Sequence, residues 1–304
     1  MLASMPELPD IELYVTRIAE RVVGQPLEKL RFYSPFVLRS VGVPAAELEG
    51  RTVTGVSRLG KRIIIELEGD RFVVIHLMIA GRFQWITPAP PLKKSFGKVL
   101  IASLRFGNGQ LDLVEMSTRK RASIHLVNSK DGLKEHQRDG LNVFAATPDE
   151  FRQRLQSENR TLKRMLTNPN AFDGIGNAYS DEILFAARLS PVRLTQALKP
   201  DEVARLHEAA KTTFAYWREK LLETYVGFPK PSDITAFRKD FATHGKFKQP
   251  CQVCGSPIQH IVYAENETNY CAKCQNEGRL LADRSLSRLL KGDWPKTLEE
   301  MEEN

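Results

Sequence analysis

The sequence predicts a multidomain α+β chain in which one helix precedes an all-β block, a helical region follows, and a cysteine-rich hairpin lies near the C-terminus. Apolar residues recur at helical spacing over residues 10–23 and again after residue 147, whereas short runs rich in Val, Ile and Phe occupy residues 51–127. All four cysteines lie between residues 251 and 274. A length of 304 residues is typical of about two domains of ordinary size.

The first helix is expected over residues 10–23, where Ile11, Val15, Ile18 and Val22 share one face and Gly24 follows as the C-cap glycine. Gly, Asp and Asn residues separate the strand-like runs, and this pattern is typical of a β-sandwich or a β-barrel. These runs are residues 62–67, 72–78, 98–106 and 122–127.

The helical region is expected to begin at Thr147. This residue is a favourable N-cap, Pro148 fits the first turn, and Glu150 completes a capping box. The helical pattern continues to about residue 226 with one interruption at residues 168–176, and a connector rich in Pro, Lys and Arg follows over residues 228–250. We therefore expect a domain boundary near residues 130–146.

Composition narrows the class of protein. The net charge of +7 and the pI of about 9.2 favour partners with dense negative charge, nucleic acid first. The sequence has no run of 18 apolar residues and its first residues lack the pattern of a secretory signal, so we expect no membrane span and a cytoplasmic location. Because no cysteine lies outside the C-terminal window, a disulfide framework is not expected.

The cysteine window predicts a metal site. Cys251 and Cys254 form one CxxC pair, Cys271 and Cys274 form another, and 16 residues separate the pairs. A hairpin with strands near 257–264 and 268–271 and a turn at 265–267 brings four thiolates around one Zn²⁺. Four thiolates leave no open coordination position, so this zinc is expected to be structural; a redox role is the alternative.

Two glycines, Gly174 and Gly176, precede a helix expected to start at Asn177. Backbone N–H groups at such a helix start favour an anion, and Asn177 adds a side-chain donor. The segment is thus either a phosphate-binding junction or an ordinary turn between helices.

The segment Met5-Pro6-Glu7-Leu8-Pro9 lies at the start of the first helix. If translation starts at Met5 and this methionine is removed, Pro6 exposes a secondary amine that attacks an aldehyde-like carbon to give an iminium. The positive end of the helix disfavours the protonated amine, and Glu7 is placed to move protons. An ordinary proline-rich helix start is the simpler interpretation of the same residues.

Taken together, these motifs resemble the formamidopyrimidine-DNA glycosylase/endonuclease VIII family. The resemblance is carried by Pro6-Glu7-Leu8-Pro9, by Gly60-Lys61 before a strand, by the segment 174–182, and by the four-cysteine hairpin. It extends from residue 5 to about residue 276.

The resemblance implies an N-terminal β-sandwich catalytic domain (residues 5–138), a helix-two-turn-helix DNA-binding domain (143–247), a zinc finger (248–276) and a C-terminal extension (277–304). It also implies a bifunctional DNA N-glycosylase and AP lyase of base excision repair, acting as a monomer on double-stranded DNA with damaged bases or abasic sites. The enzyme is expected at the bacterial nucleoid.

By the same resemblance, Pro6 attacks the sugar C1′, Glu7 assists with proton transfers, and Lys61 binds a phosphate near the lesion. Glu182 is expected to help place the N-terminus. The implied DNA-binding residues are Arg119, Lys120, Arg121, Asn177, Tyr179, Glu182 and Lys246. The implied metal ligands are Cys251, Cys254, Cys271 and Cys274.

The sequence departs from the family pattern at four places. First, Met1–Ser4 precede the proline motif, and second, Asn266 stands where the family has an arginine in the zinc finger. Third, Ile79 stands where the family has a methionine, and the loop that contains Arg119 lacks an aromatic residue. Fourth, about 30 residues follow the last cysteine. In that extension, Leu286, Leu289 and Leu290 predict a short amphipathic helix.

These departures leave three alternatives. The fold either cleaves DNA, or binds damaged or unusual DNA without cleaving it, or belongs to a zinc-ribbon protein that acts on RNA or ribosomes. If the chain cleaves DNA, its preferred lesion stays open, with oxidised pyrimidines, bulky adducts or crosslinks as examples, because the loop 227–246 varies widely among relatives.

Overall fold

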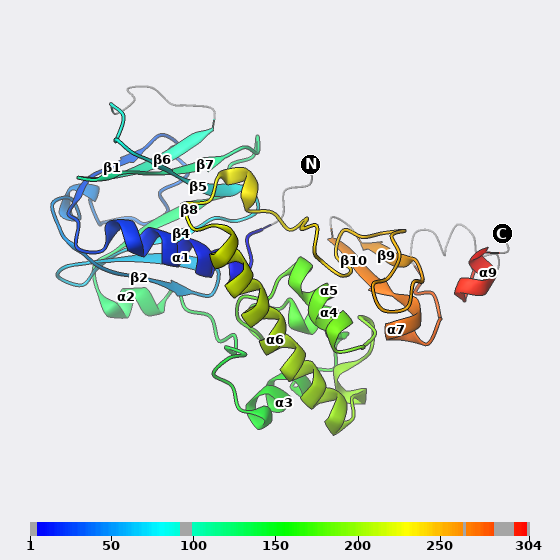
Figure 1. Cartoon of the computed structure of the whole chain (residues 1–304). Helices are drawn as coiled ribbons and strands as arrows, with labels where there is room; N and C mark the ends of the chain where they lie inside the picture. Colours follow the sequence, from blue (N-terminus) through cyan, green and yellow to red (C-terminus); the bar gives the residue numbers. More distant parts are fainter. Residues whose placement is uncertain (1–4, 92–98, 264–265, 283–294, 303–304) are drawn as a thin grey trace. The chain divides into compact units, whose positions relative to one another are not determined.

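The computed structural model describes residues 5–91, 99–263, 266–282 and 295–302. The chain divides into two compact units (Figure 1). Unit 1 comprises Met1–Arg138 with Trp217–Ala236, and unit 2 comprises Asp139–Tyr216 with Phe237–Asn304. Among the described helices, none is long and apolar enough to cross a membrane.

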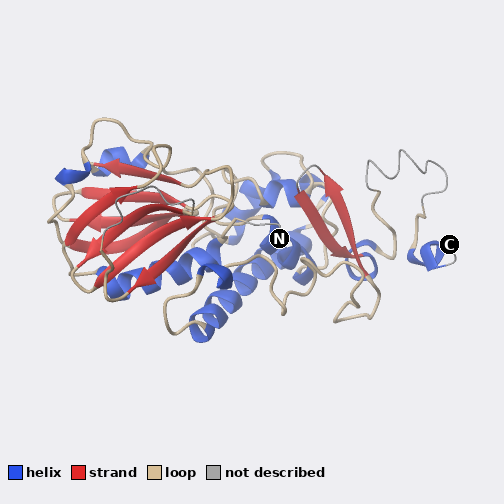
Figure 2. Cartoon of the chain, turned by 90° about the horizontal axis from the view of Figure 1, so that it is seen from above, coloured by secondary structure: helices blue, strands red, loops and turns tan. Residues whose placement is uncertain are grey.

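Unit 1 contains two four-stranded antiparallel sheets, drawn in red in Figure 2. One sheet has the order β2-β3-β4-β8, with β2 (Val53–Leu59), β3 (Arg62–Leu67), β4 (Arg71–His76) and β8 (Ser123–Val127). The other has the order β1-β6-β7-β5, with β1 (Leu27–Phe32), β6 (Leu100–Phe106), β7 (Gly109–Glu115) and β5 (Gly81–Ile86). The helices of this unit are α1 (Leu8–Val22), α2 (Lys130–Lys134), η1 (Ala45–Glu47) and η3 (Pro231–Asp233).

The two sheets form a sandwich with one leading helix, as the sequence predicts. Side chains from both sheets and from α1 share one buried cluster, which includes Ile63, Ile75, Phe83, Leu111 and Tyr14. The outer face of β3 and β4 is also apolar, and α2 covers part of it through Leu133. Because both faces of these strands are buried, their sequences are continuous apolar runs instead of alternating ones.

Helix α1 starts at Leu8, two residues before the expected start. Pro9 fits the first turn because an N–H group there needs no partner within the helix, and the Glu7 N–H donates to Asp10 Oδ2 at 2.9 Å. Gly24 follows the C-cap residue Val23 with φ +80°, which confirms its helix-ending role.

The strand expected over residues 72–78 ends at His76, because residues 77–80 form a turn. Gly81 N donates to Leu77 O at 2.9 Å across this turn. A Cβ atom on Gly81 would lie 2.4 Å from the same Leu77 oxygen, so a side chain at this position would open the turn. The strand expected over residues 122–127 corresponds to β8, which is one residue shorter. The strand expected over residues 98–106 corresponds to β6, and residue 98 lies outside the described residues.

Unit 2 consists mainly of helices followed by a β-hairpin. Its elements are α3 (Pro148–Gln156), α4 (Leu162–Leu166), α5 (Asn177–Ala186), η2 (Thr195–Ala197), β9 (Ile258–Tyr263), β10 (Asn266–Cys271), α7 (Ala272–Asn276) and α9 (Leu298–Glu302). Helix α6 (Pro200–Thr224) begins in unit 2 and its last turns belong to unit 1. The predicted capping box is confirmed: Thr147 N donates to Glu150 Oε2 at 2.8 Å, and Glu150 N donates to Thr147 Oγ1 at 3.3 Å.

The hairpin differs from its expected form in one respect. Asn266 and Glu267 belong to β10, paired with Tyr263 and Val262, and the strand expected only from residue 268 therefore starts earlier. Residues 264 and 265 lie outside the described part, and so does the helix expected around Leu286, Leu289 and Leu290. Within unit 2, β10 of the hairpin and the helix α7 that follows it both pack against α5.

Candidate metal centre and nucleic-acid interface

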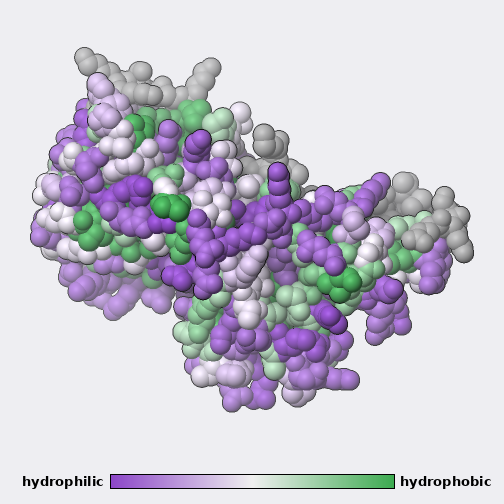
Figure 3. Space-filling view, in the orientation of Figure 1, coloured by the Kyte–Doolittle hydropathy of each residue, from purple (hydrophilic) through white to green (hydrophobic). Residues whose placement is uncertain are grey.

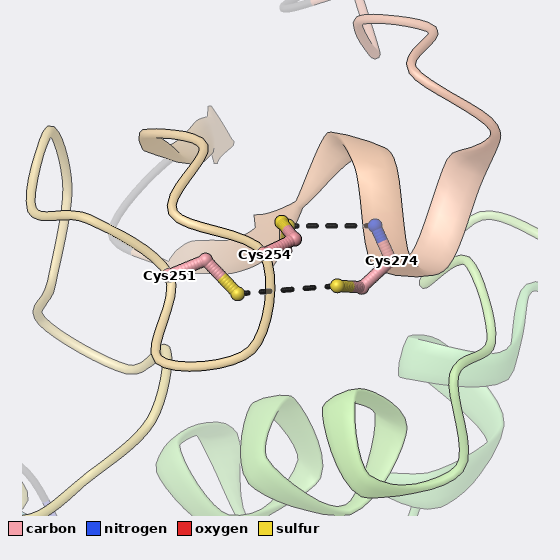
Figure 4. Close-up of side chains that lie close together, drawn as sticks. Cys251, Cys254 and Cys274 are labelled. Atoms are coloured by element: carbon pink, nitrogen blue, oxygen red, sulfur yellow. Dashed lines mark hydrogen bonds between the residues drawn. The ribbon is translucent and has the colours of Figure 1, made fainter.

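The four cysteines converge at one point of unit 2. Their Sγ atoms all lie within 4.8 Å of one another, and no other described group of three or more His, Cys, Asp or Glu residues is arranged in this way. Cys251 Sγ lies 3.9 Å from Cys274 Sγ, and Cys254 Sγ lies 3.4 Å from Cys271 Sγ; Figure 4 shows the Cys251 and Cys274 side chains pointing toward one another. Sulfur atoms around a tetrahedral zinc are separated by about 3.8 Å, given Zn–S bonds of roughly 2.3 Å.

Local backbone contacts support these sulfur atoms. Val253 N lies 3.4 Å from Cys251 Sγ, and Cys274 N lies 3.4 Å from Cys271 Sγ, so each CxxC turn directs an N–H group at its first sulfur. Cys251 and Cys271 are buried and pack with Ile258 and Phe185. The donor set fits a thiolate-bound structural metal, since four sulfur ligands fill a tetrahedral shell.

The junction before α5 has the conformation that the glycines predict. Gly174 has φ +77°, a value that side-chain-bearing residues rarely adopt, and Gly176 is the N-cap of α5. Asn177 is the first residue of α5, and its Nδ2 donates to Glu267 O of the hairpin at 2.9 Å. The asparagine expected to bind phosphate thus also joins the helix start to the zinc hairpin.

A buried charge network, which no motif in the sequence predicts, adjoins this junction. Asp181 on α5 is 0% exposed. One oxygen, Oδ1, accepts from Lys163 Nζ of α4 at 2.5 Å; the other, Oδ2, lies 2.7 Å from His244 Nδ1 and accepts from Asn269 N of β10 at 3.0 Å. Lys163 Nζ also donates to Asn177 O at 2.6 Å. A single carboxylate therefore holds together two helices, a loop and the zinc hairpin.

Glu182 forms a second buried anchor in unit 2. Its carboxylate accepts backbone N–H groups of Ala242, Thr243 and His244 at 2.7 to 2.9 Å, and also the Thr243 hydroxyl at 3.0 Å. Burial raises the pKa of Glu182, and these hydrogen bonds oppose that shift. Within this unit the residue fixes the loop 242–244; its expected effect on the N-terminus stays a prediction.

Two further expected DNA-binding residues occupy different environments. Tyr179 is 1% exposed, and its ring packs near the rings of Phe214 and Phe241 at centroid distances of 5.6 and 5.3 Å. Lys246 lies at the surface and its Nζ donates to Lys239 O at 2.6 Å. Tyr179 is thus part of the core behind the junction, whereas Lys246 belongs to the connector before the first cysteine.

In unit 1, Pro6 and Glu7 lie directly before α1. Both residues are buried, and Glu7 is 3% exposed. The neighbouring core contains Tyr14, whose hydroxyl accepts from Phe83 N at 3.1 Å and whose pKa is raised by burial. Arg82 is also buried: its Nε donates to Ile234 O at 2.9 Å, burial lowers its pKa, and Asp10 and Tyr14 oppose this shift. The start of α1 therefore combines a helix N-terminus with a nearby fixed cation.

Lys61 is the second residue of the two-residue turn that joins β2 to β3. Gly60 precedes it with φ +62°, a conformation that a tight hairpin turn requires and that glycine adopts at little cost. Lys61 is half-buried, and its charge contributes to lowering the pKa of His76 at the end of β4.

The loop between β7 and β8 carries Arg119, Lys120 and Arg121. Arg119 and Arg121 are exposed, whereas the Lys120 ammonium donates back to Glu115 O. Glu115 is 1% exposed, and its carboxylate accepts Arg121 N at 3.0 Å and Ala122 N at 3.2 Å. This buried carboxylate, which the sequence analysis did not single out, shapes the loop and leaves two arginines in solvent.

Hydrophilic side chains cover much of the face drawn in Figure 3. Of the sequence-predicted residues, the structure brings the four cysteines together and joins Asn177 to the finger. Pro6, Glu7, Lys61 and the β7–β8 loop belong to unit 1, while the other predicted DNA-binding residues and the cysteines belong to unit 2.

Three family models match successive parts of the chain. They are the formamidopyrimidine-DNA glycosylase N-terminal domain at residues 5–124, the formamidopyrimidine-DNA glycosylase H2TH domain at residues 141–216, and the zinc finger found in FPG and IleRS at residues 248–276.

Curated relatives cover nearly the same span. The chain is 31% identical over 280 residues to the formamidopyrimidine-DNA glycosylase of Thermus thermophilus, covering 90% of this chain and all of the relative. It is 30% identical over 282 residues to the enzyme of the same name from Geobacillus kaustophilus, covering 89% of this chain and all of that relative.

Solved structures show the same likeness. A Lactococcus lactis formamidopyrimidine-DNA glycosylase bound non-covalently to DNA with an AP site matches with a TM-score of 0.74 at 26% identity, covering 89% of this chain and 99% of that one. The Thermus thermophilus protein matches with a TM-score of 0.74 at 29% identity, covering 90% and 100%. With three family models in sequence and relatives matched over their whole length, this chain belongs to the formamidopyrimidine-DNA glycosylase family.

Proposed function

We propose that this chain is a DNA-repair glycosylase with AP-lyase activity, and that the Pro6 amine is its nucleophile. The observation that carries the proposal is the position of Pro6 and Glu7 directly before α1, in a chain that matches formamidopyrimidine-DNA glycosylases over their full length. The positive end of α1 disfavours an ammonium ion at this place, which helps to keep the amine nucleophilic at neutral pH.

In the proposed reaction the Pro6 nitrogen forms a bond to C1′ as the bond from C1′ to the damaged base breaks, and the leaving base takes up a proton. Glu7 protonates the sugar ring oxygen as the ring opens, which gives an iminium between Pro6 and C1′. Removal of a C2′ proton then expels the 3′ phosphate, a second elimination expels the 5′ phosphate, and water releases the amine. The damaged nucleotide must first leave the base stack, at a cost of a few kcal/mol.

The other predicted residues bind and position the DNA in this proposal. Lys61 and Asn177 bind backbone phosphates, and the exposed Arg119 and Arg121 face the duplex, with Lys120 held back on Glu115. Lys246 adds positive charge. Tyr179 and Glu182 act indirectly: Tyr179 packs in the core next to the junction, and Glu182 holds the loop 242–244 in place. A single Zn²⁺ held by the four cysteines keeps the hairpin folded.

The partner in this proposal is double-stranded DNA that contains damaged bases or abasic sites, and the enzyme acts as a monomer. Solved relatives bound to DNA with an AP site or with Fapy-dG support this substrate class. The relatives are bacterial, which supports action in the bacterial cytoplasm at the nucleoid. Lesion preference follows from the loops that depart from the family pattern.

Borohydride trapping on duplex DNA with one abasic site tests the nucleophile. A chain that begins at Pro6 is expected to form a covalent adduct, because borohydride reduces the iminium to a stable amine. The chain that retains Met1–Met5 is expected to form none, since its Pro6 nitrogen is an amide. Pro9→Ala in the chain that begins at Pro6 is the matched control and is expected to retain the adduct.

Absence of an adduct from the chain that begins at Pro6, with DNA binding retained, would refute the lyase and identify a non-cleaving DNA-binding protein. Mass spectrometry of the N-terminus isolated from cells checks the accompanying requirement. The expected mass is that of a chain beginning at Pro6.

A further inference from the structure

One group of arginine and histidine side chains in unit 1 has no role in the proposed chemistry. Arg62 is the first residue of β3, His125 lies within β8, and His136 and Arg138 follow α2. We call these four residues the basic cluster. It adjoins Lys61 in the turn before β3 and His76 at the end of β4.

Strand pairing places these residues on one face of the sheet. Arg62 pairs with His76 across β3 and β4, and His125 pairs with Val74 across β4 and β8. Directly paired residues in an antiparallel sheet point to the same side, and so do residues two apart on one strand. Arg62, His76 and His125 therefore continue the face whose apolar part, Ile64, Phe72, Val74 and Val127, is covered by Leu133.

The segment after α2 completes the cluster. The rings of His125 and His136 lie 4.6 Å apart between centroids, and Arg62 Nη1 donates to His136 O at 3.3 Å. Arg62, His125 and His136 are half-buried, and Arg138 is exposed. The cluster is thus partly shielded from water and open on one side.

The charges in this region are almost all of one sign. Burial first, and then Arg62, Lys61, Arg138 and His125, lower the pKa of His76 to about 4. Burial, His136, Arg62 and Arg39 lower the pKa of His125 to about 4. The pKa of His136 is lowered by burial and Arg62 and raised by Glu135, the only carboxylate among the groups that shift these three histidines.

A cation is the wrong ligand for such a site. Three histidines close together are common metal ligands, yet among the described residues only the four cysteines have their ligand atoms within 4.8 Å of one another. Fixed positive charge from Arg62, Arg138 and Lys61 repels a metal ion and attracts an anion. Guanidinium and imidazolium groups are the donors that bind phosphate oxygens.

We propose that Arg62, His125, His136 and Arg138 form a phosphate-binding site beside Lys61 and His76. A bound phosphate group offers the negative charge that the cluster lacks, and its oxygens accept from the guanidinium and imidazole N–H groups. Because an anion favours protonated imidazoles, phosphate and protons are taken up together. The phosphate belongs either to a nucleic-acid backbone or to a small phosphate compound; in its backbone form the proposal rests on the proposed function.

Histidine NMR on the full chain tests the site. The sequence has six histidines, and their Cε1–Hε1 signals are followed from pH 4 to 8 in chloride and in inorganic phosphate at equal ionic strength. Phosphate is expected to raise the pKa of His125 and His136 by about one unit, equivalent to roughly tenfold tighter binding of the anion to the protonated form. His207 and His260 in unit 2 are internal controls and are expected to stay unchanged.

Variants link this response to the cluster. Arg62→Gln is expected to abolish the phosphate-dependent shift of His125. Arg71→Gln, at the other end of the β3–β4 pair, is the matched control and is expected to retain it. If Arg62→Gln disturbs the fold of unit 1, as seen from the backbone amide signals of this unit, His136→Gln takes its place with the same expectation for His125.

A duplex with an abasic-site analogue then separates the two sources of phosphate. If the duplex shifts His125 and His136, and Arg62→Gln lowers the slope of log Kd against log salt by about 0.9, the site binds a backbone phosphate. If inorganic phosphate alone causes the shift, the site binds a small phosphate compound. No shift with either ligand, or an equal shift at His207, would overturn the proposal. The borohydride adduct is scored separately, so failure of the Pro6 chemistry leaves the inorganic phosphate response intact.

Discussion

Asp181→Ala is the substitution that the structure predicts to damage unit 2 most specifically. The carboxylate is fully buried and holds Lys163, His244 and Asn269, which come from α4, the loop 242–244 and β10. Its removal leaves the Lys163 ammonium, whose side chain is only 11% exposed, with the Asn177 carbonyl as an acceptor but without its carboxylate partner. The Asn269 N–H group loses its acceptor in a buried place.

The expected cost follows from these contacts. Breaking a buried ion pair by removing one partner costs about 3–5 kcal/mol, because a charge stays buried without compensation. An unsatisfied buried N–H group costs about 1–3 kcal/mol when it stands alone, and the two effects overlap at one site. We expect Asp181→Ala to lower the free energy of unfolding of unit 2 by about 3–5 kcal/mol, and Asp181→Asn to lower it by less, because the amide retains acceptor and shape.

Urea denaturation followed by circular dichroism at the helix band measures this loss. Asp149→Ala is the matched control, since Asp149 pairs with Arg152 at 3.0 Å but its side chain is 76% exposed. An exposed pair of this kind contributes less than about 1 kcal/mol. Equal losses for Asp181→Ala and Asp149→Ala would refute the argument that burial of the network, and not charge pairing as such, stabilises the junction.

Three further predictions follow from the metal site, the Lys61 turn and the histidines. Cys251→Ser, or removal of the metal by a chelator, is expected to unfold the hairpin and weaken DNA binding, checked by metal analysis together with a binding titration; full binding after verified metal loss would show the finger to be dispensable. Lys61→Ala is expected to reduce DNA binding and turnover for every lesion alike, because phosphate contacts position DNA without reading the base. A panel of lesion-bearing duplexes measures this, and an effect on one lesion only would contradict the assignment. The lowered pKa values of His76 and His125 mean that the unfolded chain takes up protons first, so their stabilising contribution is complete above about pH 6.5 and is lost as the pH falls toward about 4. His125→Gln is therefore expected to make the stability of unit 1 less steep in this pH window, and an unchanged slope would count against the shifted pKa.

Much of the fold was predictable because local patterns determine it. The run Ile63-Ile64-Ile65 predicted a strand, which the structure shows to be buried on both faces. Thr147 with Glu150 predicted a helix start, since capping depends on residues only three apart. The two CxxC pairs predicted a four-sulfur site for a similar reason: each pair is a short turn, and one hairpin brings the two together.

The element ends that differ depend on contacts outside the local pattern. β4 stops at His76 because the turn to Gly81 needs the Leu77 carbonyl, and β10 begins at Asn266 because the register with β9 extends that far. Neither the turn nor the register is visible in hydrophobic periodicity.

The sequence by itself determined the order of the elements, the four-cysteine group and the family, because these depend on residue types at short, fixed spacings. Only the tertiary structure decided which charged residues are buried together. Asp181 lies 18 residues from Lys163 and 63 from His244, and no motif in the sequence links these three residues or singles out Glu115. Their roles follow from burial, which makes each unpaired charge costly and therefore fixes its partners, and burial is set by the packing of distant segments.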